Sequence, residues 1–283
     1  MDGDIRIWLD NLPPALARQR VVLRRLVAGV ERDPRWRFLA LSCSLARGAG
    51  DEDSDLDLAL GVAADAWPSA LDALPALLSG VGEIVDMLHH RLPEWGDWPH
   101  RRTFAQYADG MQVDLVAYPA GTGRGRPPQT VVLYDPAGHL AEPFVPSVYK
   151  ADATAVREWA FLGWTALADM AKYLRRGSNW EALERLQQAR ASIWRLWAVA
   201  RGVDYPAFGL TSVLDDPAAG LPDGIERTVA GLDPDELRRA ALTGVTLLDH
   251  TSLLAASVVE ADRPTAMATY VRRLLESLPD GAR

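Results

Sequence analysis

Three aspartates in the N-terminal half of the chain have the spacing of a metal-binding site on a β-sheet. Asp55 and Asp57 alternate with leucines, and a later apolar run carries Asp114 between two further apolar residues. Side chains on a strand point alternately to opposite faces, so we expect Asp55 and Asp57 to share one face while the leucines face a core. Carboxylates that share a face repel one another, and magnesium, a hard cation with oxygen ligands, would relieve that repulsion. The three aspartates are therefore the candidate catalytic residues and the candidate metal ligands.

The segment before the aspartates has the composition of a phosphate-binding turn. Small residues and glycines, among them Ser44 and Gly48, follow the apolar run that ends near Leu41. Backbone N–H groups in such a turn, with the Ser44 hydroxyl, can hold the outer phosphates of a nucleoside triphosphate. Two metal ions held by three carboxylates can then polarise the α-phosphate and activate an attacking hydroxyl. The alternative is a solvated acidic turn that runs into an edge strand, which is the interpretation we favour for Asp51 and Asp53.

These residues resemble the signature of the DNA-polymerase-beta-like nucleotidyltransferase superfamily, which has a Gly-Ser turn, an Asp-x-Asp strand and a third acidic residue on a neighbouring strand. The resemblance covers roughly residues 36 to 118. The order of elements and the total length are similar to those of bacterial aminoglycoside and lincosamide nucleotidyltransferases. The resemblance implies two magnesium ions on the three aspartates and ATP or another nucleoside triphosphate as co-substrate, with Ser44 on the β- and γ-phosphates and Arg47 in the same loop. Cys43 stands where the family has glycine, and we expect its thiol to be a small buried hydrophobic group.

Weaker signals point to a general base and to further nucleotide contacts. Glu83 and Asp86 lie three positions apart and so face opposite sides of a strand, which means that only one of them can reach the site. Glu83 is the favoured base. Ordinary surface acids remain the alternative for both. Lys172 and Tyr173, near the end of a predicted helix, are candidates to touch the triphosphate and stack on the base. The end of an amphipathic helix explains this pair equally well.

The elements that position these residues follow from apolar periodicity and turn signals. In the first half, helices are expected at residues 14–32 and 66–79, and strands at 36–43, 55–61, 83–88, 103–107, 111–118 and 130–134. The second half reads as helices only, at residues 153–174, 233–261 and 264–278, with another that opens on a capping box at Ser178. We therefore predict an α+β fold, with a mixed-sheet domain at residues 1–145 followed by an all-α helical bundle at residues 146–283.

Composition limits the partners and the location. The net charge of −8 argues against a nucleic-acid partner and suits a cationic one. The single cysteine excludes an internal disulfide. The N-terminus has no signal-peptide pattern and no apolar run approaches membrane-spanning length, so we expect a cytoplasmic protein without a membrane partner.

The resulting hypothesis is a magnesium-dependent nucleotidyltransferase that releases pyrophosphate and moves a nucleoside monophosphate, with AMP from ATP favoured, onto a hydroxyl. The expected acceptor is a small hydroxylated molecule such as an aminoglycoside or lincosamide antibiotic. Two alternatives remain open. One is a protein- or tRNA-modifying nucleotidyltransferase of the toxin–antitoxin type, and the other is a non-catalytic nucleotide-binding relative.

Overall fold

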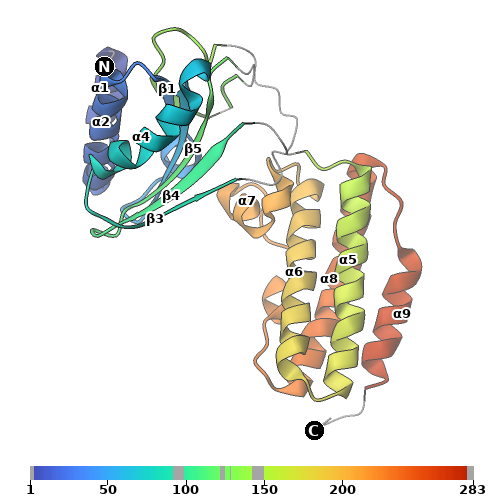
Figure 1. Cartoon of the computed structure of the whole chain (residues 1–283). Helices are drawn as coiled ribbons and strands as arrows, with labels where there is room; N and C mark the ends of the chain where they lie inside the picture. The colour runs from blue at the N-terminus through green and yellow to red at the C-terminus, as the bar shows by residue number, and fades with distance from the viewer. Residues whose placement is uncertain (1–2, 92–98, 122–124, 128, 142–149, 279–283) are drawn as a thin grey trace. The chain divides into compact units, whose positions relative to one another are not determined.

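The chain forms two compact units, Met1–Val148 and Tyr149–Arg283. The computed structural model describes residues 3–91, 99–121, 125–127, 129–141 and 150–278 (Figure 1). The first unit contains the sheet and the second contains helices without strands among the residues described, so the chain has the predicted α+β class.

A six-stranded mixed sheet organises the first unit. Its strands are β1 (Trp36–Leu41), β2 (Leu56–Val62), β3 (Ile84–His90), β4 (Arg101–Tyr107), β5 (Gln112–Pro119) and β6 (Val131–Tyr134). They lie in the order β3-β4-β5-β2-β1-β6. β2 and β5 run parallel, whereas each of the other neighbouring pairs is antiparallel. The parallel pair places two segments that are distant in the sequence side by side at the centre of the sheet.

Helices cover one face of this sheet (Figure 1). They are α1 (Gly3–Asp10), α2 (Ala17–Arg32), which follows the short helix η1 (Pro14–Leu16), and α4 (Trp67–Ser79), which follows η2 (Ala64–Ala66). The predicted inward residues of β2, Leu56, Leu58 and Leu60, are at most 4% exposed within this core. Each buried leucine stabilises the fold by about 1.5 to 3 kcal/mol, so the leucines fix the register of β2. The residues that alternate with them necessarily lie on the opposite face.

The end of β1 differs from the prediction. The strand stops at Leu41, and a short helix, α3 (Cys43–Ala46), begins two residues later. Cys43 has a φ of 60°, in the left-handed region, which a continuing strand does not tolerate. The sequence therefore predicted the strand two residues too long.

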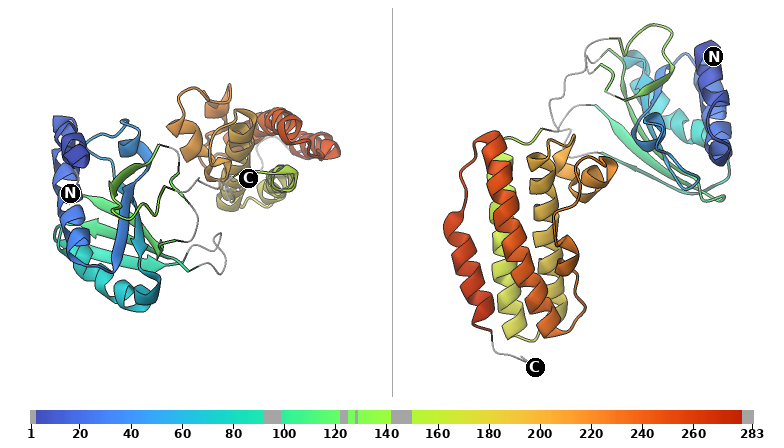
Figure 2. Two further views of the ribbon diagram at one scale, coloured as in Figure 1. Left: turned by 90° about the horizontal axis from the view of Figure 1, so that it is seen from above. Right: turned by 180° about the vertical axis from the view of Figure 1, so that it is seen from behind.

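The second unit is a helical bundle (Figure 2). Its elements are α5 (Ala153–Arg175), α6 (Asn179–Ala200), η4 (Pro206–Phe208), α7 (Leu210–Asp215), η5 (Ile225–Thr228), α8 (Pro234–Val259) and α9 (Thr265–Glu276). Asp233 caps α8 as a good N-cap residue should, because its side chain accepts the Glu236 N–H at 2.9 Å. Ser178 precedes α6, but its side chain makes no capping hydrogen bond, so the predicted capping box is wrong.

One helix in the described part of the chain, α8, is long and apolar enough to span a membrane. Its inward side chains, such as Leu237, Val245 and Leu248, are at most 1% exposed and lie in the core of the bundle. Such burial is what the central helix of a bundle requires.

Candidate active site

The parallel register of β2 and β5 brings two of the predicted aspartates together. Asp57 lies directly opposite Asp114, on strands that are roughly 4.8 Å apart. Asp55 immediately precedes β2, and its charge acts on Asp57. Asp57 and Asp114 lie on the sheet face opposite the helices, because they alternate with the buried leucines and valines of the core. We call this side of the sheet the aspartate face.

The electrostatics of Asp57 show an excess of negative charge at this point. The pKa of Asp57 is raised to about 6, first by burial and then by the neighbouring charge of Asp55, with Asp114 adding to the effect. A hydrogen bond from the Cys43 thiol and the charge of Arg102 act in the opposite direction. The ionised form of Asp57 is therefore disfavoured by its surroundings, and a further positive charge would stabilise it.

Arg102 is a residue of the candidate site that the sequence did not predict. It lies on β4, and its Nε donates to both carboxylate oxygens of Asp114, at 2.8 Å to Oδ1 and 3.0 Å to Oδ2. Its Nη2 also binds Oδ2. The Asp109-Gly110 turn, which predicts the β4–β5 hairpin, was the available signal, because the hairpin register sets Phe104 opposite Asp114 and Arg102 diagonally beside it.

The predicted phosphate turn contains a backbone conformation that explains a preference for glycine. Cys43 is left-handed, at φ 60°, and an L-residue pays about 1 to 2 kcal/mol for that conformation, whereas glycine adopts it freely. Cys43 is also exposed, so the prediction of a buried thiol is wrong. The left-handed backbone turns the side chain away from the core, and the thiol makes a hydrogen bond with Asp57. Ser44 is half-buried in the single turn of α3, and Arg47 ends that turn with its N–H 3.2 Å from the Cys43 carbonyl.

A buried glutamine anchors the loop that precedes the aspartates. Gln19 on α2 is 0% exposed, and its Nε2 donates to the carbonyls of Asp51, Glu52 and Ser54 at 3.0 to 3.2 Å. Asp51 in turn accepts the Ser54 hydroxyl at 3.0 Å and the Asp53 N–H at 3.1 Å. Both Asp51 and Asp53 are exposed. The structure thus gives Asp51 the role of a turn residue, as the alternative interpretation of these acids proposes.

The structure does not bring Glu83 to the aspartates. Glu83 precedes the edge strand β3, and its carbonyl accepts the Ala108 N–H at the hairpin end of the sheet. The row of residues that contains Asp114 continues through Phe104 to Leu88, five residues beyond Glu83 and roughly 16 Å along the strand. Asp86 pairs with Gln106 and shares the aspartate face, two residues from that row. Asp86, and not Glu83, therefore shares a sheet face with the aspartates.

Lys172 and Tyr173 lie in the second unit, near the end of α5. The Lys172 Nζ is 2.6 Å from Asp169 Oδ1 and 4.8 Å from the centre of the Tyr173 ring, and the Arg185 guanidinium lies 5.8 Å from the same ring. The first two contacts lie within α5, and the contact of Arg185 joins α6 to α5. A nucleotide contact by this pair stays a prediction.

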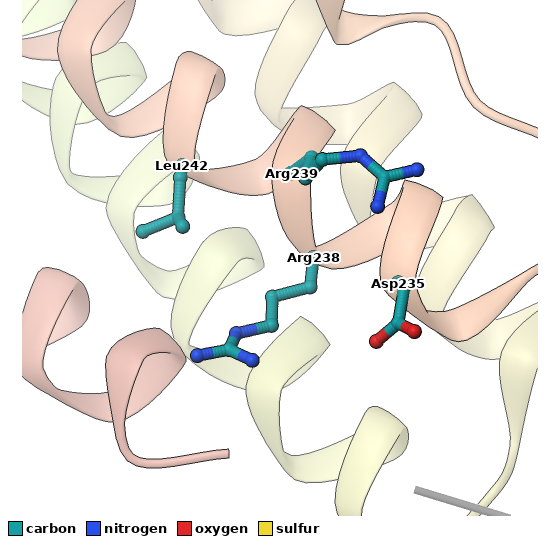
Figure 3. Close-up of a pocket in the computed structure, with 4 residues that line it drawn as sticks. All are labelled: Asp235, Arg238, Arg239 and Leu242. Carbon is teal, nitrogen blue, oxygen red and sulfur yellow. The ribbon is translucent and has the colours of Figure 1, made fainter. Parts of the chain in front are cut away.

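The second unit also has a hollow of about 330 Å³, lined by Asp235, Arg238, Arg239 and Leu242 (Figure 3). Arg238 donates from Nε to the Leu275 carbonyl at 3.1 Å and from Nη2 to the Glu276 carbonyl. Arg238 therefore fastens the end of α9 to α8, which is a structural role.

The aspartates are oxygen donors that suit a divalent cation, although Asp114 is bound to Arg102. Within the residues that the structure describes, no three His, Cys, Asp or Glu side chains are arranged as a metal site. The donor chemistry nevertheless fits magnesium, because carboxylate oxygens are its preferred ligands and the pKa of Asp57 stays raised, by burial and by the charge of Asp55, although Arg102 acts to lower it.

Comparisons with known proteins find ten solved chains of similar structure, among them the two that follow. No protein-family model matches the chain, and no curated protein matches it. An aminoglycoside 6-adenyltransferase from Bacillus subtilis aligns over 91% of this chain and 98% of its own, with 14% identity and a TM-score of 0.42. A nucleotidyltransferase-like protein from Exiguobacterium sibiricum 255-15 aligns over 91% of this chain and 88% of its own, with 14% identity and a TM-score of 0.37.

Proposed function

We propose that the chain is a metal-dependent nucleotidyltransferase whose reaction takes place on the aspartate face. The observation that carries the proposal is the parallel register that sets Asp57 beside Asp114, with Asp55 next to them. Adjacent carboxylates repel one another, and their charges add to burial in raising the pKa of Asp57. A site that binds a cation and its phosphate ligands gives them a purpose.

Magnesium is the cation that the donor set fits, and Asp55, Asp57 and Asp114 are the residues that would hold it. When bound, the metal supplies charge stabilisation at the phosphate under attack. The co-substrate of the enzyme would be ATP or another nucleoside triphosphate. Ser44 and the backbone of the turn at Cys43 would bind the outer phosphates of that nucleotide, and Arg47 ends the same turn.

The reaction transfers a nucleoside monophosphate to a hydroxyl. The acceptor oxygen forms a bond to the α-phosphorus, the bond from that phosphorus to the bridging oxygen breaks, and pyrophosphate leaves. The hydroxyl proton passes to a carboxylate. The strand register favours Asp86 over Glu83 for this task, because Asp86 lies on the aspartate face.

The acceptor in this proposal is a small hydroxylated molecule such as an aminoglycoside or lincosamide antibiotic. The half-buried Phe104 and the 62% exposed Leu88 continue the row that contains Asp114 and form an apolar shelf beside the carboxylates. A sugar or ring system can lie on such a shelf. The net charge of −8 suits a cationic acceptor.

A transfer screen read by mass tests the proposal. The full chain is incubated with magnesium, a nucleoside triphosphate and a panel of aminoglycosides and lincosamides, and a lysate is included to detect protein or tRNA acceptors. We expect one acceptor to gain the mass of a nucleoside monophosphate, and we expect Asp55→Asn with Asp57→Asn to abolish the gain. The matched control is Asp53→Asn, at an exposed acid in the same loop, which should remain active. An active Asp55/Asp57 double variant would overturn the assignment of the site.

A further inference from the structure

The Arg102–Asp114 ion pair occupies a carboxylate that the proposed function needs for a metal ion. Asp114 is well buried, with a side chain 13% exposed, whereas the Arg102 side chain is 35% exposed. The guanidinium engages both carboxylate oxygens, the two-pronged geometry in which arginine binds anions most strongly. A cation that takes Asp114 as a ligand must compete with this arrangement.

Arg102 is also placed to bind an anion once it leaves Asp114. It lies on the aspartate face, two residues from Phe104, in a row that runs across the sheet through Val116 and His90. Its charge already acts on Asp57 as well as on Asp114. A guanidinium binds phosphate with the same fork that binds a carboxylate, so a polyphosphate on this face offers an equivalent partner.

We propose that Arg102 is a phosphate-binding residue that is held on Asp114 until a metal–triphosphate complex arrives. The inference rests on the proposed function. Asp114 would then be available to hold the metal, and the Arg102 guanidinium would bind the phosphates that accompany it, so that neither charge is left without a partner. In the absence of nucleotide, the same arginine opposes binding of the metal alone. Arg102 thereby makes the metal and the triphosphate bind together.

The chain offers a matched control in the neighbouring residue. Arg101 carries the same charge, but it pairs with the buried Ala117 and acts on His89, so it lies on the helix-covered side of the sheet. Arg101→Ala removes a positive charge at the position next to Arg102 on β4. Arg102→Lys keeps the charge of Arg102 but loses the fork.

The test measures binding of the two ligands separately, with the full chain. Free Mn²⁺ is followed by electron paramagnetic resonance without nucleotide, and binding of Mg–ATP is measured by calorimetry. We expect Arg102→Ala to bind Mn²⁺ about tenfold more tightly than the wild type and Mg–ATP about tenfold more weakly. For both ligands, the affinity of Arg102→Lys should lie between the affinities of the wild type and of Arg102→Ala. The affinities of Arg101→Ala should match those of the wild type. Circular dichroism melting of each variant establishes that it is folded.

A purely structural role of Arg102 would not shift the affinities for the two ligands in opposite directions. If Arg102→Ala weakens both ligands, Arg102 only positions Asp114, and the inference is overturned. Unchanged Mn²⁺ affinity in a folded Arg102→Ala variant overturns it as well. Failure of the proposed function gives a different result. The wild type would then bind neither Mn²⁺ nor Mg–ATP, or would bind them in a way that Asp57→Asn does not abolish.

Discussion

Replacement of Asp57 by asparagine should stabilise the first unit while it removes a proposed metal ligand. Asparagine keeps the shape of the side chain and carries no charge. Because the pKa of Asp57 rises from 3.8 to about 6 in the folded chain, ionising this carboxyl at pH 8 costs the fold at most about 3 kcal/mol. The stabilisation expected from removing this charge is partly offset, because Asp57→Asn also loses the attraction between Asp57 and Arg102. We therefore expect Asp57→Asn to raise the free energy of unfolding at pH 8 by about 1 to 3 kcal/mol.

The sign of the pH dependence follows from the direction of the pKa shift. A carboxyl whose pKa is raised by folding binds its proton more tightly in the folded chain than in the unfolded chain. The contribution of Asp57 to wild-type stability is therefore greatest below about pH 4 and is lost as the pH rises through 6. The difference between Asp57→Asn and the wild type should open between these values and stay constant above them.

The assay must report on the first unit, because the chain has two units and need not unfold in one step. Hydrogen exchange of peptides from β2 and β5, measured by mass spectrometry against urea in the presence of EDTA, isolates that unit. The matched control is the exposed Asp53→Asn, which should change stability by less than about 0.5 kcal/mol. Added magnesium should then stabilise the wild type and leave Asp57→Asn unchanged. A destabilised Asp57→Asn, or a difference from wild type that is the same at pH 4 and pH 8, would refute the electrostatic reasoning.

Four further variants test three separate parts of the site. Cys43→Gly should relieve the left-handed backbone and keep or improve the affinity for Mg–ATP in calorimetry, and a large loss would show that the thiol itself is needed. Asp86→Asn should lower the rate of transfer at least tenfold, whereas Glu83→Gln should leave it within about twofold, and the reverse order would restore Glu83 as the base. Gln19→Ala leaves three loop carbonyls without their donor and should lower the free energy of unfolding by about 2 to 3 kcal/mol in urea titrations. A change below about 0.5 kcal/mol would mean that the loop at residues 51–54 holds itself in place.

Local patterns predicted most of the fold and the orientation of the site. The alternation of aspartates with leucines was sufficient to turn Asp57 outward, since the buried leucines fix the register of β2. The Asp109-Gly110 turn was sufficient for the β4–β5 hairpin. The pairing of Asp57 with Asp114 is different, because it depends on a parallel contact between segments that no local period connects. The carboxylate chemistry grouped the two residues in one candidate site, and the resemblance put the third acid on a neighbouring strand, but neither predicted the register.

The errors have physical reasons of their own. The left-handed backbone at Cys43 has no sequence signal when the residue is not glycine, so the thiol was wrongly placed in the core. The register shift between Ile84 and Asp86 in β3 has no sequence signal either, and it determines where the acidic residues near this strand lie. An arginine on a strand carries no signal of its own, and only the hairpin register, which places Arg102 diagonally beside Asp114, reveals the ion pair.

The central claim is that the aspartate face binds a nucleoside triphosphate through a divalent metal, and calorimetry of ATP binding with and without magnesium tests it most directly. The account predicts that the wild type binds ATP in magnesium, that EDTA abolishes the binding, and that Asp57→Asn with Asp114→Asn abolishes it in a chain that is still folded. Equal binding by the wild type and this double variant, or no binding of any common nucleoside triphosphate at millimolar concentration, would contradict it.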